Sequence, residues 1–250
     1  MVLVHGWGMN RRIFNSLRNK LSNNYQVIMV DLPGHGDNQH NRTLTLDAVA
    51  EQLLDQIDGR CHWLGWSLGG AIVMHVAQRA PERFRSLMFI AANPYFVKAL
   101  NWTHGIDPDV LNDFEQKLAQ YPEKTLKRFI ALQVLHSDDS HTTSQQLKEV
   151  LCASNSPDRQ SLLQGLAILQ KQDQRKALAS LHLPMQVILG ASDALIPVSV
   201  KSYYEQLASQ PEIHVIAGAG HVPFLSHQQQ VYKLIAAFLH QYSEKVEAHG

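Results

Sequence analysis

The sequence of 250 residues has few cysteines, no net charge and no long apolar run. Its two cysteines, Cys61 and Cys152, lie far apart, which favours two free thiols in a reducing compartment over a disulfide framework. Lys plus Arg and Asp plus Glu both number 22, which argues against a general nucleic-acid or anionic-membrane binder. No run approaches the roughly 20 apolar residues of a membrane span, and we expect no signal peptide before the first apolar segment. We expect a monomeric cytoplasmic protein that binds neither nucleic acid nor membrane.

Short β-type runs alternate with helical patterns in the first and last parts of the chain. The β-type runs are 2–4, 25–30, 61–64, 86–92, 185–189 and 213–216. Helical spacing is found over 11–23, 46–57, 71–80 and 231–239. This alternation predicts an α/β fold with a mostly parallel sheet and helices on both faces.

Between Pro94 and Pro184 the β-type signal stops, and segments with helical spacing follow one another. These segments are 107–120, 123–136, 144–152 and 158–171. About 90 residues is far longer than an ordinary loop of about 4–6 residues. We therefore expect residues 1–94 and 184–250 to form the core and residues 95–183 to form a helical cap. The cap is either a structural appendage or a lid over a site at the carboxyl ends of the strands.

The segment GWSLG (65–69) joins a β-type run to a helical pattern. It has the pattern of a nucleophile elbow, in which Ser67 adopts a strained backbone conformation with its hydroxyl exposed. The two glycines let the strand and helix backbones come close together. Because a serine hydroxyl is a poor nucleophile at neutral pH, it needs a base that is oriented by a third group.

Candidate partners for this serine follow the last two β-type runs. Asp193 comes just after the fifth run, and His221 lies in the small-residue loop after the sixth. The chain order serine, acid, histidine is the order that accompanies this elbow. No acid follows the fourth run, where the chain reads Asn93-Pro94, so Asp193 is the predicted acid.

Two backbone N–H groups are predicted to stabilise the oxyanion of acyl transfer. One belongs to Leu68, directly after the serine and at the amino end of a helix, where the helix dipole is favourable. The other belongs to Trp7, in a loop where Gly6 and Gly8 permit an unusual backbone turn. The alternative is that this loop is an ordinary turn.

Two further polar segments are not expected to bind a metal or a dinucleotide. HSDDSH (136–141) lacks the ligand spacing of a known metal site, and we interpret it as a solvated polar turn. AGAGH (217–221) is rich in glycine but lacks the full dinucleotide fingerprint. We expect neither a metal nor an organic cofactor.

The motifs LVHGWGMN, VDLPGHG, WLGWSLGG, PMQVILGASDALIP and GAGHVPFLSH together resemble the α/β-hydrolase superfamily over essentially the whole chain. Within it, the sequence is similar to the carboxylesterases of biotin synthesis that remove the methyl ester from pimeloyl-acyl carrier protein. The resemblance implies that Ser67 is the nucleophile, Asp193 the orienting acid and His221 the base. It also implies that Trp7 and Leu68 supply the oxyanion N–H groups.

The same resemblance implies how the substrate is bound. Trp7, Leu68 and Phe129 would contact it, with Phe129 on the inner face of the cap near the acyl chain. The partner would be an acyl carrier protein that carries a methyl-esterified acyl chain. A general short-chain esterase, a lactonase or a carbon–carbon bond hydrolase would use the same three catalytic residues. A non-catalytic ligand-binding relative would keep the fold without turnover.

A basic helix face is a candidate docking site for such a carrier. Lys124, Lys127 and Arg128 have the i, i+3 and i+4 spacing that brings side chains together on one face of a helix. An ordinary solvated lysine face would have the same spacing. The sequence leaves both interpretations open.

One departure from the family pattern concerns the beginning of the sheet. Members of this fold normally have two strands before the one that ends in His-Gly, yet here that strand is residues 2–4. The two missing strands would neighbour residues 25–30, so we expect that apolar run to be an unprotected edge strand. The catalytic positions lie elsewhere, so the expected effect is on stability and aggregation.

Overall fold

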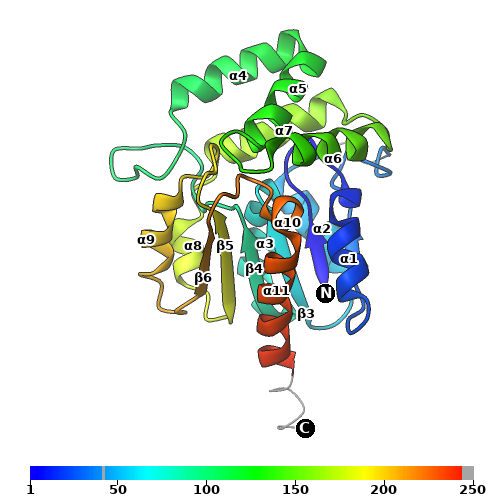
Figure 1. Ribbon diagram of the computed structural model, residues 1–250. Helices are drawn as coiled ribbons and strands as arrows, with labels where there is room; N and C mark the ends of the chain where they lie inside the picture. Colours follow the sequence, from blue (N-terminus) through cyan, green and yellow to red (C-terminus); the bar gives the residue numbers. More distant parts are fainter. Residues whose placement is uncertain (41–42, 244–250) are drawn as a thin grey trace.

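The computed structural model describes residues 1–40 and 43–243, and its strands form one parallel sheet (Figure 1). The strands are β1 (Val2–Val4), β2 (Ile28–Val30), β3 (Cys61–Trp66), β4 (Phe84–Ile90), β5 (Met185–Gly190) and β6 (Glu212–Ile216). They lie in the order β2-β1-β3-β4-β5-β6, and every neighbouring pair is parallel. The central strands are apolar and buried on both faces, as a parallel sheet covered by helices requires.

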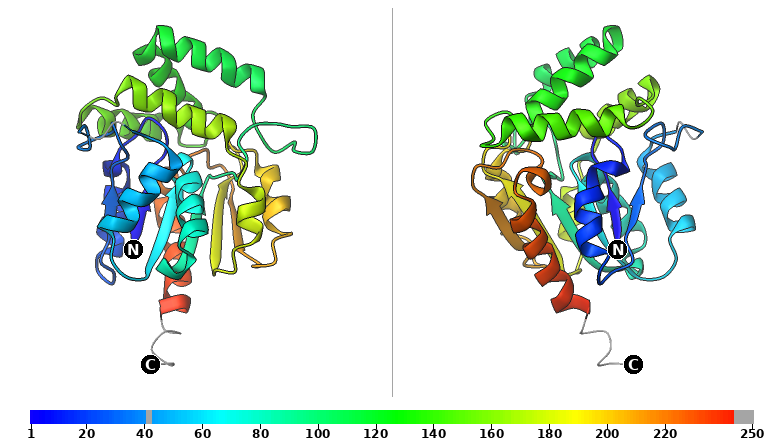
Figure 2. Two further views of the ribbon diagram at one scale, coloured as in Figure 1. Left: turned by 180° about the vertical axis from the view of Figure 1, so that it is seen from behind. Right: turned by 45° about the vertical axis from the view of Figure 1, so that its right-hand side comes forward.

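Helices cover both faces of this sheet (Figure 2). One face carries α1 (Asn15–Leu21), α10 (Pro223–Ser226) and α11 (Gln228–Ser243), and the 3-10 turn Arg11–Phe14 precedes α1. The other carries α2 (Leu46–Gln56), α3 (Leu68–Arg79), α8 (Arg175–Ala179) and α9 (Lys201–Tyr204). Further 3-10 turns lie at Pro81–Arg83 and Val198–Val200. Each face has its own cluster of buried apolar side chains, so the sheet is the middle of three layers.

A further group of helices lies over the carboxyl ends of the strands (Figure 1). They are α4 (Pro108–Gln120), α5 (Pro122–Gln133), α6 (Ser140–Cys152) and α7 (Arg159–Lys171), and are called the cap helices below. Pro108 and Pro122 occupy the first helical position, where proline has no hydrogen bond to lose. The Asp158 side chain accepts the Ser161 N–H and caps α7. The expected helices are therefore found, with ends shifted by a few residues.

Strand β2 forms one edge of the sheet, and within the described ranges it pairs only with β1. It is shorter than the expected run 25–30, because the Tyr25 N–H donates to the Leu21 carbonyl (3.0 Å) and prolongs the turn after α1. Its three residues are half-buried, and a hollow of about 360 Å³ lies beside them. The expected edge strand is present, although only the second half of the run is a strand. No helix in the part of the chain that the structure describes is long and apolar enough to cross a membrane.

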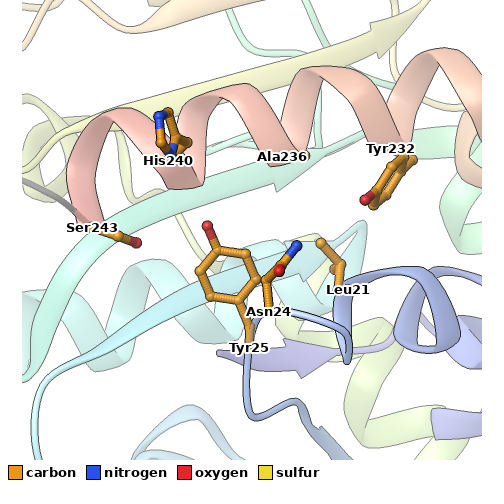
Figure 3. A pocket seen from close by; sticks show the side chains of 7 residues that line it. All are labelled: Leu21, Asn24, Tyr25, Tyr232, Ala236, His240 and Ser243. Carbon is orange, nitrogen blue, oxygen red and sulfur yellow. The ribbon is translucent and has the colours of Figure 1, made fainter.

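A second hollow, of about 390 Å³, lies between α11 and the turn after α1 (Figure 3). It is lined by Leu21, Asn24, Tyr25, Tyr232, Ala236, His240 and Ser243. His62, near the amino end of β3, hydrogen bonds to the Ser86 hydroxyl (2.7 Å) and the Ser243 hydroxyl (3.3 Å). Burial lowers the pKa of His62 to about 4. This hollow therefore lies at the opposite end of the strands from Ser67, which follows the carboxyl end of β3.

His5 is a second buried histidine, and its hydrogen bonds require a neutral ring. Nδ1 donates to the Gly6 carbonyl (2.8 Å), and Nε2 accepts the Leu32 N–H (3.0 Å). Because Nε2 accepts a hydrogen bond, it carries no proton. Burial, with a smaller contribution from His35, lowers the pKa of His5 to about 3.

The lowered pKa values of His5 and His62 predict that the folded protein loses stability in mild acid. Both remain neutral in the folded protein, whereas an unfolded histidine titrates near pH 6.5. Their contribution to stability is therefore complete above about pH 6.5 and is lost as the pH falls toward 4. For each histidine, the free energy of unfolding falls by up to about 1.4 kcal/mol per pH unit in this window. The midpoint of urea unfolding should fall between pH 7.5 and 5, and His62→Gln should flatten that dependence. Equal slopes for the two proteins would contradict the assignment to His62.

Candidate active site

Ser67 occupies a strained turn between β3 and α3. Its φ of 55° and ψ of −119° lie in a region that residues other than glycine rarely adopt. A side chain on Gly65 would collide with the Gly69 carbonyl, and one on Gly69 would collide with the Val4 carbonyl. Only glycine fits at positions 65 and 69, two residues before and two residues after the serine. The predicted elbow is therefore present.

His221 links Ser67 and Asp193 in a chain of hydrogen bonds. Nε2 of His221 lies 2.9 Å from the Ser67 hydroxyl oxygen, and Nδ1 lies 2.8 Å from Oδ2 of Asp193. The other carboxylate oxygen accepts the N–H groups of Leu195 (2.8 Å) and Ile196 (3.0 Å). The side chains of His221 and Asp193 are each 1% exposed. The structure thus brings the three predicted residues together in the arrangement of a catalytic triad, and their roles stay a prediction.

The loop that carries His221 is held from several sides. The Trp66 indole N–H donates to the His221 carbonyl (2.9 Å), and the two rings lie 5.7 Å apart. The Ser192 N–H, next to the acid, donates to the Ala219 carbonyl (2.9 Å). From the cap helices, the Gln133 carbonyl accepts the His221 N–H (2.9 Å). The position of the imidazole therefore depends on the core and on α5 together.

The N–H groups of Trp7 and Leu68 are available for an oxyanion. In the described part of the chain, neither N–H has a hydrogen-bond acceptor. A Cβ on Gly6 would lie 3.1 Å from the Ser67 Cβ, so the loop of Trp7 lies against the elbow. The indole N–H of Trp7 donates to the Leu162 carbonyl (2.8 Å), which fixes that loop to α7. This arrangement fits the predicted oxyanion donors, and their role stays a prediction.

Ser67 is less accessible than the sequence led us to expect. It is 7% exposed, because the cap helices lie over the elbow and the neighbouring loop. A Cβ on Gly8 would lie 2.7 Å from a Leu126 methyl group and 3.7 Å from a Leu162 methyl group. The cap helices bury their apolar inner face here, and that burial closes the site from above.

Phe129 lies on the inner side of α5, as expected, and is 9% exposed. Its ring centroid lies 4.8 Å from that of Trp7 and 6.0 Å from that of Phe114. Phe114 could not be recognised in the sequence, because nothing separates it from the other apolar positions of α4. Gly165 was not recognised either, and a Cβ there would lie 3.0 Å from the Trp7 ring and 3.1 Å from Leu68. A glycine inside a helical pattern is a usable signal for such close approach.

The polar segment 136–141 is exposed except at Ser137, as expected, and its last two residues are the first residues of α6. It is not only a solvated turn, because the Asp138 N–H donates to the Gly218 carbonyl (2.9 Å) in the loop of His221. Residues 1–40 and 43–243 contain no group of three or more His, Cys, Asp or Glu side chains that could hold a metal ion.

The three candidate docking cations are exposed on α5 but divide between two hollows. Lys124 and Arg128 line a hollow of about 200 Å³, next to Lys117. Lys127 lines a larger groove of about 650 Å³ on the other side of α5. At about 100° per residue, Lys127 is rotated about 100° from Arg128 around the helix axis. The expected single face is therefore split, because Lys127 lies at its border.

Comparison with known proteins shows the family of this chain. The family model described as the alpha/beta hydrolase fold matches residues 1–228. A bromoperoxidase from Bacillus anthracis superposes with a TM-score of 0.85 at 22% identity, over 95% of this chain and 90% of that chain. An esterase from Exiguobacterium antarcticum has a TM-score of 0.83 at 18% identity, over 96% and 91%. The chain belongs to the α/β-hydrolase family, and the expected fold class is confirmed.

Curated relatives are more similar in sequence than these structures. The pimeloyl-[acyl-carrier protein] methyl ester esterase of Yersinia pestis is 36% identical over 238 residues, which is 95% of this chain and 92% of the relative. The proteins of the same name from Citrobacter koseri and Pectobacterium carotovorum are also 36% identical. They match 95% of this chain and 92% and 93% of their own lengths. The resemblance inferred from the motifs is therefore confirmed.

The triad geometry predicts how substitutions change ester hydrolysis. Ser67→Ala and His221→Ala should lower kcat by a factor of the order of 10⁴–10⁶, and Asp193→Asn somewhat less, because the three groups act as a unit. Steady-state hydrolysis of a short p-nitrophenyl ester measures this, and circular dichroism checks the fold. Ser86→Ala is the matched control, since Ser86 also hydrogen bonds to a histidine but lies at the far end of the sheet. Turnover near the wild-type level in Ser67→Ala would refute the nucleophile assignment.

Proposed function

We propose that this protein is a serine carboxylesterase that hydrolyses the methyl ester of a pimeloyl group carried by acyl carrier protein. The product would be the free terminal carboxylate for biotin synthesis. The hydrogen-bonded chain from Ser67 through His221 to Asp193 carries the proposal for the reaction. The relatives that are 36% identical over 95% of the chain support the substrate, and they confirm the expected class of ester hydrolase.

In the proposed mechanism, the Ser67 oxygen attacks the ester carbonyl carbon while Nε2 of His221 takes the hydroxyl proton. Asp193, hydrogen bonded to Nδ1, stabilises the imidazolium. The N–H groups of Trp7 and Leu68 stabilise the negative oxygen of the tetrahedral intermediate. The intermediate collapses, and methanol leaves with the proton from His221. A water molecule, deprotonated by His221, then attacks the carbonyl carbon of the acyl-enzyme. The bond from that carbon to the Ser67 oxygen breaks, His221 returns the proton to this oxygen, and the acid is released.

The cap would bind the substrate's acyl chain. We propose that residues 1–94 and 184–250 form the catalytic core and that residues 95–183 form a cap that closes over the chain. The contacts among Trp7, Phe114 and Phe129 support an apolar site for a flexible aliphatic chain. The enzyme would act as a cytoplasmic monomer on a carrier protein, without a metal or an organic cofactor.

Two experiments test the substrate. The wild-type gene should restore growth without biotin to a bacterial strain that lacks its own ester hydrolase of this pathway, and Ser67→Ala should not. The purified enzyme should release methanol from the methyl ester of pimeloyl-acyl carrier protein. Hydrolysis of short free esters together with failure in both experiments would instead favour a general short-chain esterase, a lactonase or a carbon–carbon bond hydrolase. A ligand-binding relative would turn over none of these esters.

If the carrier docks on α5, the charges on this helix should affect hydrolysis of the carrier-linked ester, and the effect should depend on salt. Reversing Lys124, Lys127 and Arg128 to Glu should weaken use of the carrier-linked ester by roughly one to two powers of ten at low salt. Each exposed charge pair is worth roughly 0.2–1 kcal/mol, and salt should reduce the effect. A small free methyl ester should be hydrolysed almost as before. Parallel losses on both substrates, or no loss on either, would show that these residues do not dock the carrier.

A further inference from the structure

The larger groove beside Lys127 lies between α5, α6 and α7 and has a volume of about 650 Å³. Its apolar lining includes Leu126, Ile130 and Leu162, from α5 and α7. An apolar groove of this size is large enough for part of a drug-sized or lipid-like molecule.

This groove lies directly above the candidate oxyanion loop. Leu126 and Leu162 line it, and the same two side chains are the nearest neighbours of a Cβ built on Gly8. The Leu162 carbonyl also accepts the indole N–H of Trp7 (2.8 Å). Two leucine side chains therefore separate the groove from the loop that lies against Ser67. Leu126 is half-buried and Leu162 is buried, so a path from the groove to this loop opens when these two side chains change rotamer.

The groove also has a cationic rim. Lys127, Lys148 and Arg159 line it and are exposed, whereas Glu123 is its acidic lining residue. Within the described residues, neither lysine forms an ion pair, and Arg159 donates to a neutral acceptor, the Ala119 carbonyl (2.6 Å). The rim can therefore bind an anion without first breaking an internal ion pair.

We infer that this groove is the passage through which the acyl chain of a carrier-linked ester reaches Ser67, and that Lys127 and Lys148 hold the phosphate of the carrier's pantetheine arm. The inference rests on the proposed function, because a carrier-linked acyl chain is attached through an arm that ends in a phosphate group. The apolar floor suits the chain, and the rim suits the single anionic group of the arm. A lysine binds phosphate as a point charge and needs no fixed geometry to do so.

Cys152 lines the groove, is exposed and provides a direct test of the passage. Cys61, the other free thiol, lies at the amino end of β3 and can be replaced by serine. In Cys61→Ser protein, a bulky maleimide on Cys152 should lower kcat/KM for a long-chain p-nitrophenyl ester at least tenfold. Iodoacetamide, which adds a much smaller group, should have little effect. The double variant Cys61→Ser, Cys152→Ser should keep its activity after either treatment. Full activity of the maleimide-labelled protein, with labelling verified by mass, would overturn the inference.

Two small substrates without a carrier protein test the rim. They are the methyl pimeloyl thioesters of phosphopantetheine and of pantetheine, which differ only in the phosphate. The wild type should prefer the phosphorylated substrate by about tenfold in kcat/KM for methyl ester hydrolysis at low salt. Lys127→Glu with Lys148→Glu should abolish this preference. Lys171→Glu with Lys176→Glu changes the net charge equally, outside the groove, and should retain it.

The possible outcomes test the role of the groove and the proposed function separately. Equal use of the two thioesters by the wild type, or an equal loss of preference in both charge variants, would overturn the role of the rim. If neither methyl ester is hydrolysed, the proposed substrate fails. The experiment on Cys152 still decides whether acyl chains enter through the groove, because it uses an ester that needs no carrier.

Discussion

The positive φ of Ser67 is the constraint around which the site is built. A side chain at 67 can adopt this conformation only because glycines at 65 and 69 let β3, α3 and the end of β1 approach one another. That close approach places the first N–H groups of α3 beside the loop of Trp7. It also fixes the serine hydroxyl where an imidazole from the loop after β6 can reach it. Backbone strain of about 1–3 kcal/mol is sustained here by the packing of the surrounding sheet.

The cap helices do more than cover the site. The Gln133 carbonyl, at the end of α5, accepts the N–H of His221, and the Asp138 N–H, in the turn that follows α5, donates to the Gly218 carbonyl in the same loop. A displacement of this end of α5 would therefore release contacts that hold the loop of His221. The groove described above lies toward Leu126 and Leu162, nearer the amino ends of α5 and α7. Entry by that side leaves the contacts at Gln133 and Asp138 in place.

The proximity of Ser67, Asp193 and His221 could be predicted from the sequence because the signals are local. An elbow needs glycines at fixed spacing, and Asp193 and His221 follow strands that can be recognised by their apolar runs. Phe114 could not be found in this way, because its proximity to Trp7 depends on how α4 crosses the loop. The buried state of Ser67 depends in the same way on where α5 and α7 lie. The short length of β2 was also missed, because a single turn hydrogen bond at Tyr25 decides where the strand begins.

The neutral ring of His5 has a consequence for the charge beside the elbow. His5 immediately precedes Gly6, where a Cβ would lie 3.1 Å from the Ser67 Cβ, so a proton on this ring would add a cation to the segment that packs against the elbow. The Leu32 N–H occupies Nε2, and burial lowers the pKa of His5 to about 3, so the ring stays uncharged through neutral pH and mild acid. The segment that leads into the loop of Trp7 therefore gains no cation under mildly acidic conditions that protonate an exposed histidine.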